Sequence, residues 1–202
     1  MEVSINMKIG IDVDEVLAEQ LKSLVEFYRD RTGVFVPKEK FHSYYWPDIW
    51  GISLEEAVKI DIDFKETDLF DNLEVVEGSV DAINILRYDH ELVIITARPK
   101  RFKDKTLKWL DSNFGNLFSN IFHSCDFHVD NGDNKNKSDI CEDLGVDILI
   151  EDSVNNSLDC AKRGLVVLLL DKPWNQGVEH KNIYRCFSWE DILGKIKEIE
   201  NV

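Results

Sequence analysis

Two aspartates follow an apolar segment near the start of the chain. The segment IGI at 9–11 leads into Asp12, Val13 and Asp14, so that two carboxylates lie one residue apart. Like charges at this spacing disfavour each other's ionisation unless a cation or a proton is shared between them. The pair therefore indicates either a solvated turn at a helix start or a site that holds a cation.

Other polar side chains follow later apolar segments. They are Thr96, Ala97 and Arg98 after LVIIT, Lys135 and Lys137 in the loop DNGDNKNKSD, and Glu151 and Asp152 at the end of DILIED. Ligands of open parallel sheets bind at the carboxyl ends of the strands. We therefore expect these side chains to meet Asp12 and Asp14 at one edge of a sheet. Carboxylates, a hydroxyl and an ammonium together suit a hard cation with a phosphate group beside it.

The acidic residues of this set could supply a metal site, a nucleophile and a general acid and base for phosphoryl transfer. Mg²⁺ prefers about six oxygen ligands and takes few of them from protein, and Asp12, the backbone carbonyl of Asp14 and Asp152 would suffice. Asp12 is the predicted nucleophile, because a neighbouring cation offsets the repulsion between a carboxylate and a phosphate. Asp14 is predicted to protonate the leaving oxygen and then to deprotonate the attacking water.

The phosphoryl oxygens need hydrogen-bond donors as negative charge builds on them. The predicted substrate-binding residues are Thr96, Ala97, Arg98 and Lys137. Lys135 is an alternative to Lys137, which we prefer because it directly precedes the helix expected to begin near Ser138. The division of roles between Glu151 and Asp152 stays open, and Asp152 is taken as the metal ligand.

The elements that position these residues are predicted from the apolar pattern. Nearly continuous apolar runs, as in strands buried on both faces, occupy 7–11, 92–96, 120–125, 147–151 and 165–170. Between the later runs, apolar residues recur at the spacing of a helix face. The stretch SWEDILGKIKEIE predicts a last helix that Ser188 caps. Alternating strands and helices predict an α/β fold with a doubly wound parallel sheet.

About eighty residues separate the first two runs, where a crossover needs roughly a dozen or two. We therefore predict a helical insertion at 17–77, between core segments 1–16 and 78–202. It would begin with an amphipathic helix directly after the aspartates, carrying Leu17, Leu21, Leu24, Val25 and Tyr28 on one face. Aromatic residues of the insertion are expected mostly to fill its interior, with one or two facing a ligand; they are Phe41, Tyr44, Tyr45, Trp46 and Trp50.

Composition limits the class of protein. Hydrophobic residues make up 44% of the chain, which supports a packed globular protein, and the net charge of −15 disfavours binding to nucleic acid or to an anionic membrane surface. The longest apolar run, at 165–170, is far shorter than the ~20 residues of a membrane span. Four separated cysteines, without an apolar signal segment, indicate a reduced, cytoplasmic protein; they are Cys125, Cys141, Cys160 and Cys186. We expect a monomer or a homodimer.

The four motifs together resemble those of the haloacid dehalogenase superfamily of phosphotransferases. That family has a strand ending in DxDx[VT], a strand ending in Thr or Ser, a lysine before a later helix, and a strand ending in an acidic pair. The chain has IGIDVDEV, VIITARP, KSDI and ILIEDS in the same order. The resemblance implies a Rossmann-type core, and the insertion lies where the family places a helical cap of its first type.

Within the superfamily the chain is similar to the deoxyribonucleotidase-like, or 5′-nucleotidase, branch, through TARPKRFKDKTLKWL, KSDICEDLGVDILIEDS and DKPWNQ. This likeness implies a magnesium-dependent phosphatase for a small phosphorylated metabolite, with a nucleotide as the leading substrate. It implies the same roles for Asp12, Asp14 and Asp152 as above, and a supporting role for Glu151. Many members have Gly in place of Glu15, whose side chain could alter the turn or contact the insertion.

Three alternative functions stay open at this point. The protein could be a phosphatase for another small metabolite such as a sugar phosphate, a receiver-like domain, or a catalytically silent phosphate-binding protein. A receiver domain carries its phosphorylated Asp after the third strand and has no long insertion, whereas the acidic pairs here follow the first and fourth predicted strands. Hydrolysis of phosphomonoesters would distinguish the phosphatase from the other two classes.

Overall fold

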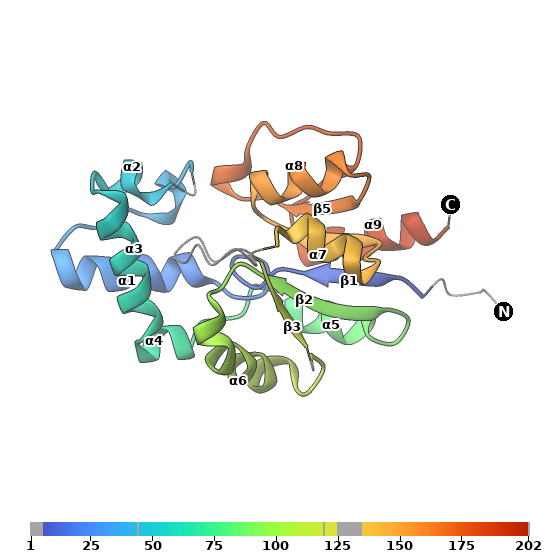
Figure 1. The fold of residues 1–202 in the computed structure, drawn as a ribbon, viewed down its shortest axis with the longest axis horizontal. Coiled ribbons are helices and arrows are strands. Elements are labelled where there is room, and N and C mark those ends of the chain that lie inside the picture. Colours follow the sequence, from blue (N-terminus) through green and yellow to red (C-terminus); the bar gives the residue numbers. More distant parts are fainter. Residues whose placement is uncertain (1–5, 44, 119, 125–134, 202) are drawn as a thin grey trace.

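A parallel sheet forms the centre of the molecule (Figure 1). The computed structural model describes residues 6–43, 45–118, 120–124 and 135–201, and within these residues the sheet has six strands in the order β3-β2-β1-β4-β5-β6. The strands are β1 (Lys8–Ile11), β2 (Glu91–Thr96), β3 (Ile121–His123), β4 (Ile148–Glu151), β5 (Val166–Leu170) and β6 (Ile183–Cys186). All neighbouring strands are parallel. The order reverses beside β1, which therefore lies between β2 and β4.

The five predicted strands are present, and the predicted fold class is confirmed. A sixth strand, β6, was not predicted from the sequence; it pairs with β5 from Val167↔Ile183 to Leu170↔Cys186. This edge strand reads IYRC, and its Tyr184 is exposed, so it lacks the continuous apolar run that marks a strand buried on both faces.

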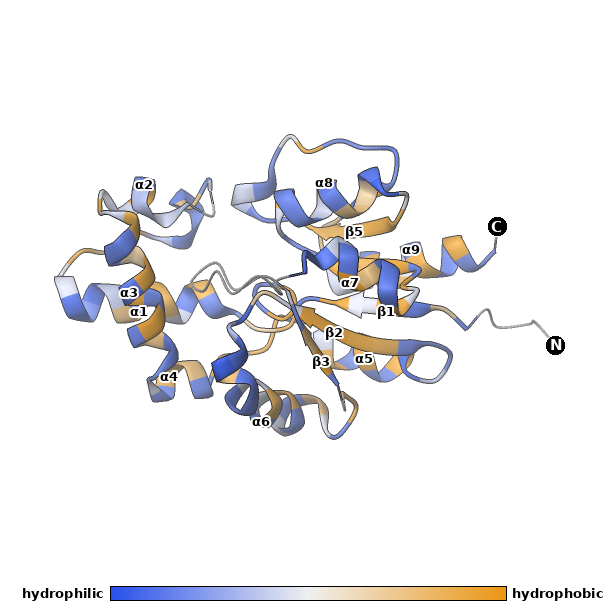
Figure 2. Ribbon diagram, in the orientation of Figure 1, coloured by the Kyte–Doolittle hydropathy of each residue, from blue (hydrophilic) through white to orange (hydrophobic). Residues whose placement is uncertain are grey.

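Helices cover both faces of the sheet, and alternate residues of each strand face different helices. One face carries α5 (Ser79–Leu86), α6 (Lys103–Phe114) and α9 (Trp189–Glu200), and the other carries α7 (Lys137–Leu144) and α8 (Val154–Lys162). Ile9 and Ile11 face the helices α5, α6 and α9 and belong to the same apolar cluster as Trp109 and Trp189. Figure 2 shows the hydrophobic strands between helices whose outward faces are hydrophilic. The short helix η2 (Lys100–Phe102) leads into α6.

Gly10 lies between Ile9 and Ile11, on the face of β1 that α7 and α8 cover. A Cβ atom added there would lie 3.0 Å from Ile95 Cδ1, 3.2 Å from Leu149 Cδ1 and 3.3 Å from Val146 Cγ1. Close packing over β1 thus favours glycine here, because a side chain would require these three neighbours to shift.

The segment between β1 and the first helix is a compact turn. The amphipathic helix was predicted to start directly after the aspartates, but α1 (Gln20–Thr32) begins later, and Leu17 lies before it. Isolated bridges join Ala18 to Asp14 and to Val75. Glu15 has φ 62°, the one positive φ of a non-glycine residue in the described part of the chain. A left-handed conformation costs such a residue about 1–2 kcal/mol, so its surroundings must stabilise it.

The inserted segment is helical. It contains α1, η1 (Lys38–Lys40), α2 (Trp46–Trp50), α3 (Leu54–Lys65) and α4 (Asp68–Asp71), which lie beyond one end of the sheet in Figure 1. The Ser53 hydroxyl accepts a hydrogen bond from Glu56 N (3.1 Å) and caps α3.

Part of the aromatic cluster fills the interior of the insertion. Trp50 stacks on Tyr28 with ring centroids 4.1 Å apart and meets the edge of the buried Phe41 ring. Tyr45 is exposed and Trp46 is half-buried, while Tyr44 lies outside the described residues. The apolar interior of the insertion is continuous with the core beneath α5, α6 and α9.

Two further expectations concern single residues. The hydroxyl of Ser188 accepts a hydrogen bond from Asp191 N (3.1 Å), so the predicted cap of the closing helix is confirmed. Cys141, Cys160 and Cys186 are buried free thiols, and Cys125 lies outside the described residues. Across the described part of the chain, no helix has both the length and the apolar character needed to cross a bilayer.

Candidate active site

The carboxyl ends of β1, β2 and β4 meet at one edge of the sheet. Asp12 follows β1, Thr96 ends β2, and Glu151 ends β4 with Asp152 next to it. Backbone pairing continues past β1, since Asp12 N donates to Ile150 O (3.1 Å). The three strands thus fix side chains that are more than a hundred residues apart in sequence.

Asp12, Glu151 and Asp152 form a buried carboxylate cluster. Each offers an oxygen within 4.8 Å of the others, and the residues are 7%, 0% and 1% exposed. The structure therefore brings together the predicted nucleophile and the predicted metal ligand Asp152. The carboxylate of Asp14 lies outside this cluster.

Lys137 lies between two members of the carboxylate cluster. Its Nζ is 2.8 Å from Asp12 Oδ1 and 2.6 Å from Glu151 Oε2, and the residue is 2% exposed. It is the first residue of α7, whose start is fixed by a hydrogen bond from Asn136 N to Asp139 Oδ2 (3.1 Å). Lys135 is instead exposed and pairs with Asp143. Of the two alternative lysines, the structure brings Lys137 to the carboxylates.

The electrostatics of the carboxylate cluster favour a further cation. Burial raises the pKa of Asp12 to about 7, against the lowering effect of Lys137, and the charges of Glu151 and Asp14 raise it further. One ammonium does not balance the carboxylates gathered around it. Hard carboxylate oxygens in a buried group are the donors that Mg²⁺ takes from proteins, so the residues present fit that ion.

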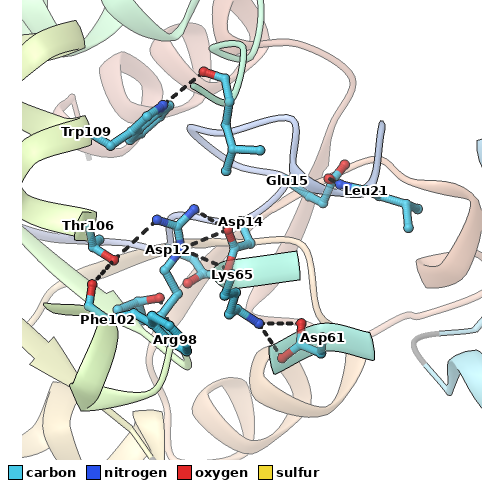
Figure 3. A network of polar contacts seen from close by, with 12 residues as sticks. Asp12, Asp14, Glu15, Leu21, Asp61, Lys65, Arg98, Phe102, Thr106 and Trp109 are labelled. Atoms are coloured by element: carbon cyan, nitrogen blue, oxygen red, sulfur yellow. Dashed lines mark hydrogen bonds and ion pairs between the residues drawn. The ribbon is translucent and has the colours of Figure 1, made fainter. Parts of the chain in front are cut away.

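Asp14 is bound by Arg98 (Figure 3). Arg98 Nε donates to both carboxylate oxygens of Asp14 (3.0 and 3.1 Å), and Nη2 donates to Oδ1 (2.5 Å). Nη1 donates to the Thr106 hydroxyl (3.3 Å), and the guanidinium lies over the Phe70 ring at 4.5 Å. The Arg98 side chain is fully buried by these contacts. Arg98, predicted as a substrate ligand, therefore holds Asp14 in this state.

The remaining predicted substrate-binding residues lie at the end of β2 and in the turn that follows it. The Thr96 hydroxyl is buried and accepts a hydrogen bond from Arg98 N (3.1 Å), while Ala97 between them is half-buried. His123 in the neighbouring strand contacts the carbonyl of Arg98 through Nδ1 (2.8 Å), and burial lowers its pKa. Neutral His123 therefore supports the backbone of this turn.

The loop after β5 holds Asp152. Trp174 Nε1 donates to Asp152 Oδ2 (3.0 Å), and Asn175 Nδ2 donates to the Asp152 carbonyl (2.9 Å). Both residues belong to η3 (Pro173–Asn175) and are buried. On the other carboxylate, Glu151 Oε1 accepts from Ser153 N (3.0 Å). Glu151 is thus held by its own loop and by Lys137.

Asn175, which holds Asp152 together with Trp174, was not expected at the site from the sequence. Asn175 is uncharged and lies in a loop between a strand and a weak edge strand, so its type and position gave no sign of a supporting role. The motif DKPWNQ carried a partial signal, because Pro173 begins a short helix that turns both side chains toward β4. The ion pair between Asp14 and Arg98 could not be predicted from the local sequence, because the two residues are 84 positions apart.

Comparison with known proteins identifies the family. The family model described as "5′ nucleotidase, deoxy (Pyrimidine), cytosolic type C protein" matches residues 6–199, nearly the whole chain. The chain belongs to this nucleotidase family. The predicted membership of the haloacid dehalogenase superfamily is confirmed. The protein is an enzyme of the phosphatase class.

Individual relatives agree with this family. The nucleotidase-family chain is 30% identical over 193 residues to a 5′(3′)-deoxyribonucleotidase of Bacillus subtilis, covering 93% of this chain and 97% of that protein. It is 22% identical over 196 residues to a nucleotidase of Clostridium acetobutylicum, covering 96% and 95%. A haloacid dehalogenase-like hydrolase from Streptococcus pneumoniae has the same fold, with TM-score 0.70, 15% identity and coverage of 95% and 98%.

Proposed function

We propose that this protein is a magnesium-dependent phosphatase of small nucleotides that passes through an aspartyl phosphate on Asp12. The observation that carries this proposal is the meeting of Asp12 with Lys137, Glu151 and Asp152 at the ends of β1 and β4. The nucleotide as substrate is supported by the family and by the names of relatives that act on nucleotides or deoxyribonucleotides.

Asp12 and Asp152, with the backbone carbonyl of Asp14, would hold the ion. Bound there, Mg²⁺ would neutralise negative charge on the phosphate and on the carboxylates. Asp12 then attacks phosphorus, the bond to the leaving oxygen breaks, and the phosphoryl group rests on the Asp12 carboxylate. Lys137 and Thr96 would hold phosphoryl oxygens, with the backbone at Ala97 lining the same turn. Water then cleaves the aspartyl phosphate and restores Asp12.

Asp14 is the proposed general acid and base, and its contacts set a condition on that role. Both of its oxygens accept hydrogen bonds from Arg98 in the described state. To give a proton to the leaving oxygen, Asp14 has to turn away from the guanidinium. We propose that substrate binding separates the Asp14 carboxylate from Arg98. The freed guanidinium would then bind the substrate, which is the role predicted for Arg98.

The helical insertion at 17–77 is the proposed cap of this enzyme. It follows directly after Asp12 and Asp14 and lies beyond the strand ends that carry the site (Figure 1). A lid in this place would exclude water during phosphoryl transfer and contact the part of the substrate that leaves. The segments 1–16 and 78–202 form the proposed catalytic core.

The reaction is tested with p-nitrophenyl phosphate in the presence and absence of Mg²⁺. We expect magnesium-dependent turnover that falls by at least about 10³-fold in Asp12→Asn, because the nucleophile is lost. Asp143→Asn, an exposed carboxylate change, serves as the matched control and should keep the wild-type rate. An unchanged rate in Asp12→Asn would overturn the mechanism. Stable self-phosphorylation without turnover would instead support a receiver, and absence of phosphate chemistry would support a silent binder.

The substrate is tested with a panel of ribonucleoside and deoxyribonucleoside monophosphates beside sugar phosphates. We expect kcat/KM to be highest for one or more nucleotides, since a binding site for the leaving nucleoside contributes to transition-state binding. Equal values across the panel would remove the nucleotide assignment and leave the phosphatase assignment in place.

A further inference from the structure

Glu15 follows Asp14 directly and combines an unfavourable backbone with a buried carboxylate. Its φ is 62°, a conformation that favours glycine, and its side chain is 3% exposed. The turn itself is held by Glu15 N, which donates to the carbonyl of Ala18 (2.7 Å). Glycine would adopt this turn without strain, so the carboxylate is the feature that only a longer residue supplies.

The Glu15 carboxylate joins three segments of the chain. Oε1 accepts a hydrogen bond from Leu21 N (2.6 Å) at the start of α1. Oε2 is 2.7 Å from Lys38 Nζ in the insertion and 4.0 Å from Lys172 Nζ in the loop after β5. Lys38 also pairs with Glu19 (2.5 Å), which fixes its ammonium in this place.

The segments that meet at Glu15 are connected to the site. Lys172 immediately precedes η3, which holds Asp152 through Trp174 and Asn175. The short helix η1, which begins with Lys38, also lies against η3. One carboxylate therefore links the turn of the catalytic aspartates, the insertion, and the loop that supports the predicted metal ligand.

We propose that Glu15 is a positioning residue that latches η1 of the insertion onto the core, beside the loop that holds Asp152. Its salt bridge with Lys38 sets how closely this edge of the insertion lies over the site. The substrate would be retained beneath the insertion while this contact holds. The structural part of the inference stands by itself, and the kinetic part rests on the function proposed above.

The latch is tested first without any substrate, by hydrogen–deuterium exchange of the backbone at residues 36–43. Lys38→Met removes the ammonium from the partly exposed side of the pair, and Glu15→Gln removes the charge but keeps an acceptor for Leu21 N. We expect exchange in this segment to be about 5- to 10-fold faster in both variants, because local opening becomes more frequent. Lys40→Met, an exposed charge removal in the same short helix, is the matched control and should exchange like the wild type.

The double variant Glu15→Gln/Lys38→Met measures the coupling between the two side chains. If the latch is their direct contact, Glu15→Gln has no further effect once Lys38 is replaced, and exchange in the double variant matches that of Lys38→Met alone. An increase equal to the product of the single effects would overturn the latch, as would wild-type exchange in both single variants. Glu15→Gly, which suits the positive φ, covers the case in which Glu15→Gln does not fold, and should show the same faster exchange.

Steady-state kinetics then separates positioning from a general loss of structure. With the best nucleotide as substrate, we expect Lys38→Met to raise KM about 5-fold and to change kcat by less than about 2-fold, since Asp12 and Asp14 are untouched. A fall in kcat with unchanged KM would overturn retention of the substrate by the latch. If even the wild type has no phosphatase activity, the proposed function fails, while the exchange experiment still decides the structural latch.

Discussion

The ammonium of Lys137 is a buried charge held between two carboxylates of the candidate site. Burial would lower its pKa, but Asp12 and Glu151 outweigh this and raise the pKa above the ordinary value. The side chain is therefore charged at neutral pH and balances part of the carboxylate cluster. This ammonium stabilises the folded chain, and in the proposed mechanism it would also donate to a phosphoryl oxygen that approaches Asp12.

Replacement of Lys137 by Met tests both roles. We expect Lys137→Met to lower the free energy of unfolding by about 3–5 kcal/mol, because it leaves buried carboxylates without their cation. Urea unfolding at pH 7 without added metal measures this change. Turnover of p-nitrophenyl phosphate should also fall by at least about 10²-fold, as expected when a donor to the developing charge is removed.

Lys135→Met is the matched control for this change. Lys135 is exposed and pairs with Asp143, so the variant should unfold at the wild-type urea midpoint and turn over at the wild-type rate. The reverse pattern, with loss of activity in Lys135→Met alone, would assign the phosphate-binding role to Lys135.

At the scale of elements, the site depends on a loop that supplies no predicted catalytic group. The helix η3 places the indole of Trp174 and the amide of Asn175 against Asp152, and it follows β5, the neighbour of β4. Supporting hydrogen bonds of this kind orient a metal ligand and tune its affinity. The loop after β5 thus supports the carboxylate cluster although it lies outside the four motifs.

Trp174→Phe tests this support while keeping an aromatic ring. We expect Mg²⁺ affinity, measured by titration calorimetry, to fall about 10- to 100-fold, because Asp152 loses the donor to Oδ2. Trp189→Phe removes a comparable indole hydrogen bond, to the carbonyl of Val16 (3.0 Å), and serves as the control. An equal loss of affinity in the two variants would show that the Trp174 contact has no specific effect on the ion.

The sequence predicted most elements that carry the site, because strands buried on both faces leave continuous apolar runs and catalytic residues follow those runs directly. It failed where the signal is not local. The turn that precedes α1 contains Glu15, whose positive φ no propensity for Glu predicts, and the helix begins only at Gln20. The binding of Arg98 to Asp14 and the role of Asn175 depend on which loops the sheet order brings together, and a single sequence does not contain that order.

The whole molecule is strongly acidic, with a net charge of −15, while its proposed substrate is an anion. Surface charges of one sign act over the Debye length, about 30 Å at 0.01 M salt and about 8 Å at 0.15 M. The long-range field should therefore slow the approach of a nucleotide at low ionic strength. Attraction by positively charged side chains of the site then acts on the nucleotide only within a few ångströms of them.

This field predicts an unusual dependence on salt. At fixed free Mg²⁺, we expect kcat/KM for the best nucleotide to rise about two-fold or more between 0.01 and 0.15 M ionic strength, as screening removes the repulsion. Two different salts at matched ionic strength should give the same curve. A steady fall of kcat/KM with salt would show that positive charge near the entrance outweighs the acidic surface.

The central place of β1 has a consequence for how the enzyme is made. A ribosome releases the chain from its amino terminus, so Asp12 emerges well before β4 and the residues beside it are synthesised. Until β4 docks against β1, the nascent chain has the Asp12 carboxylate without Glu151 and Asp152, which complete the carboxylate cluster. The cluster is therefore assembled in one late step, and a fragment that ends before β4 lacks two of its three members.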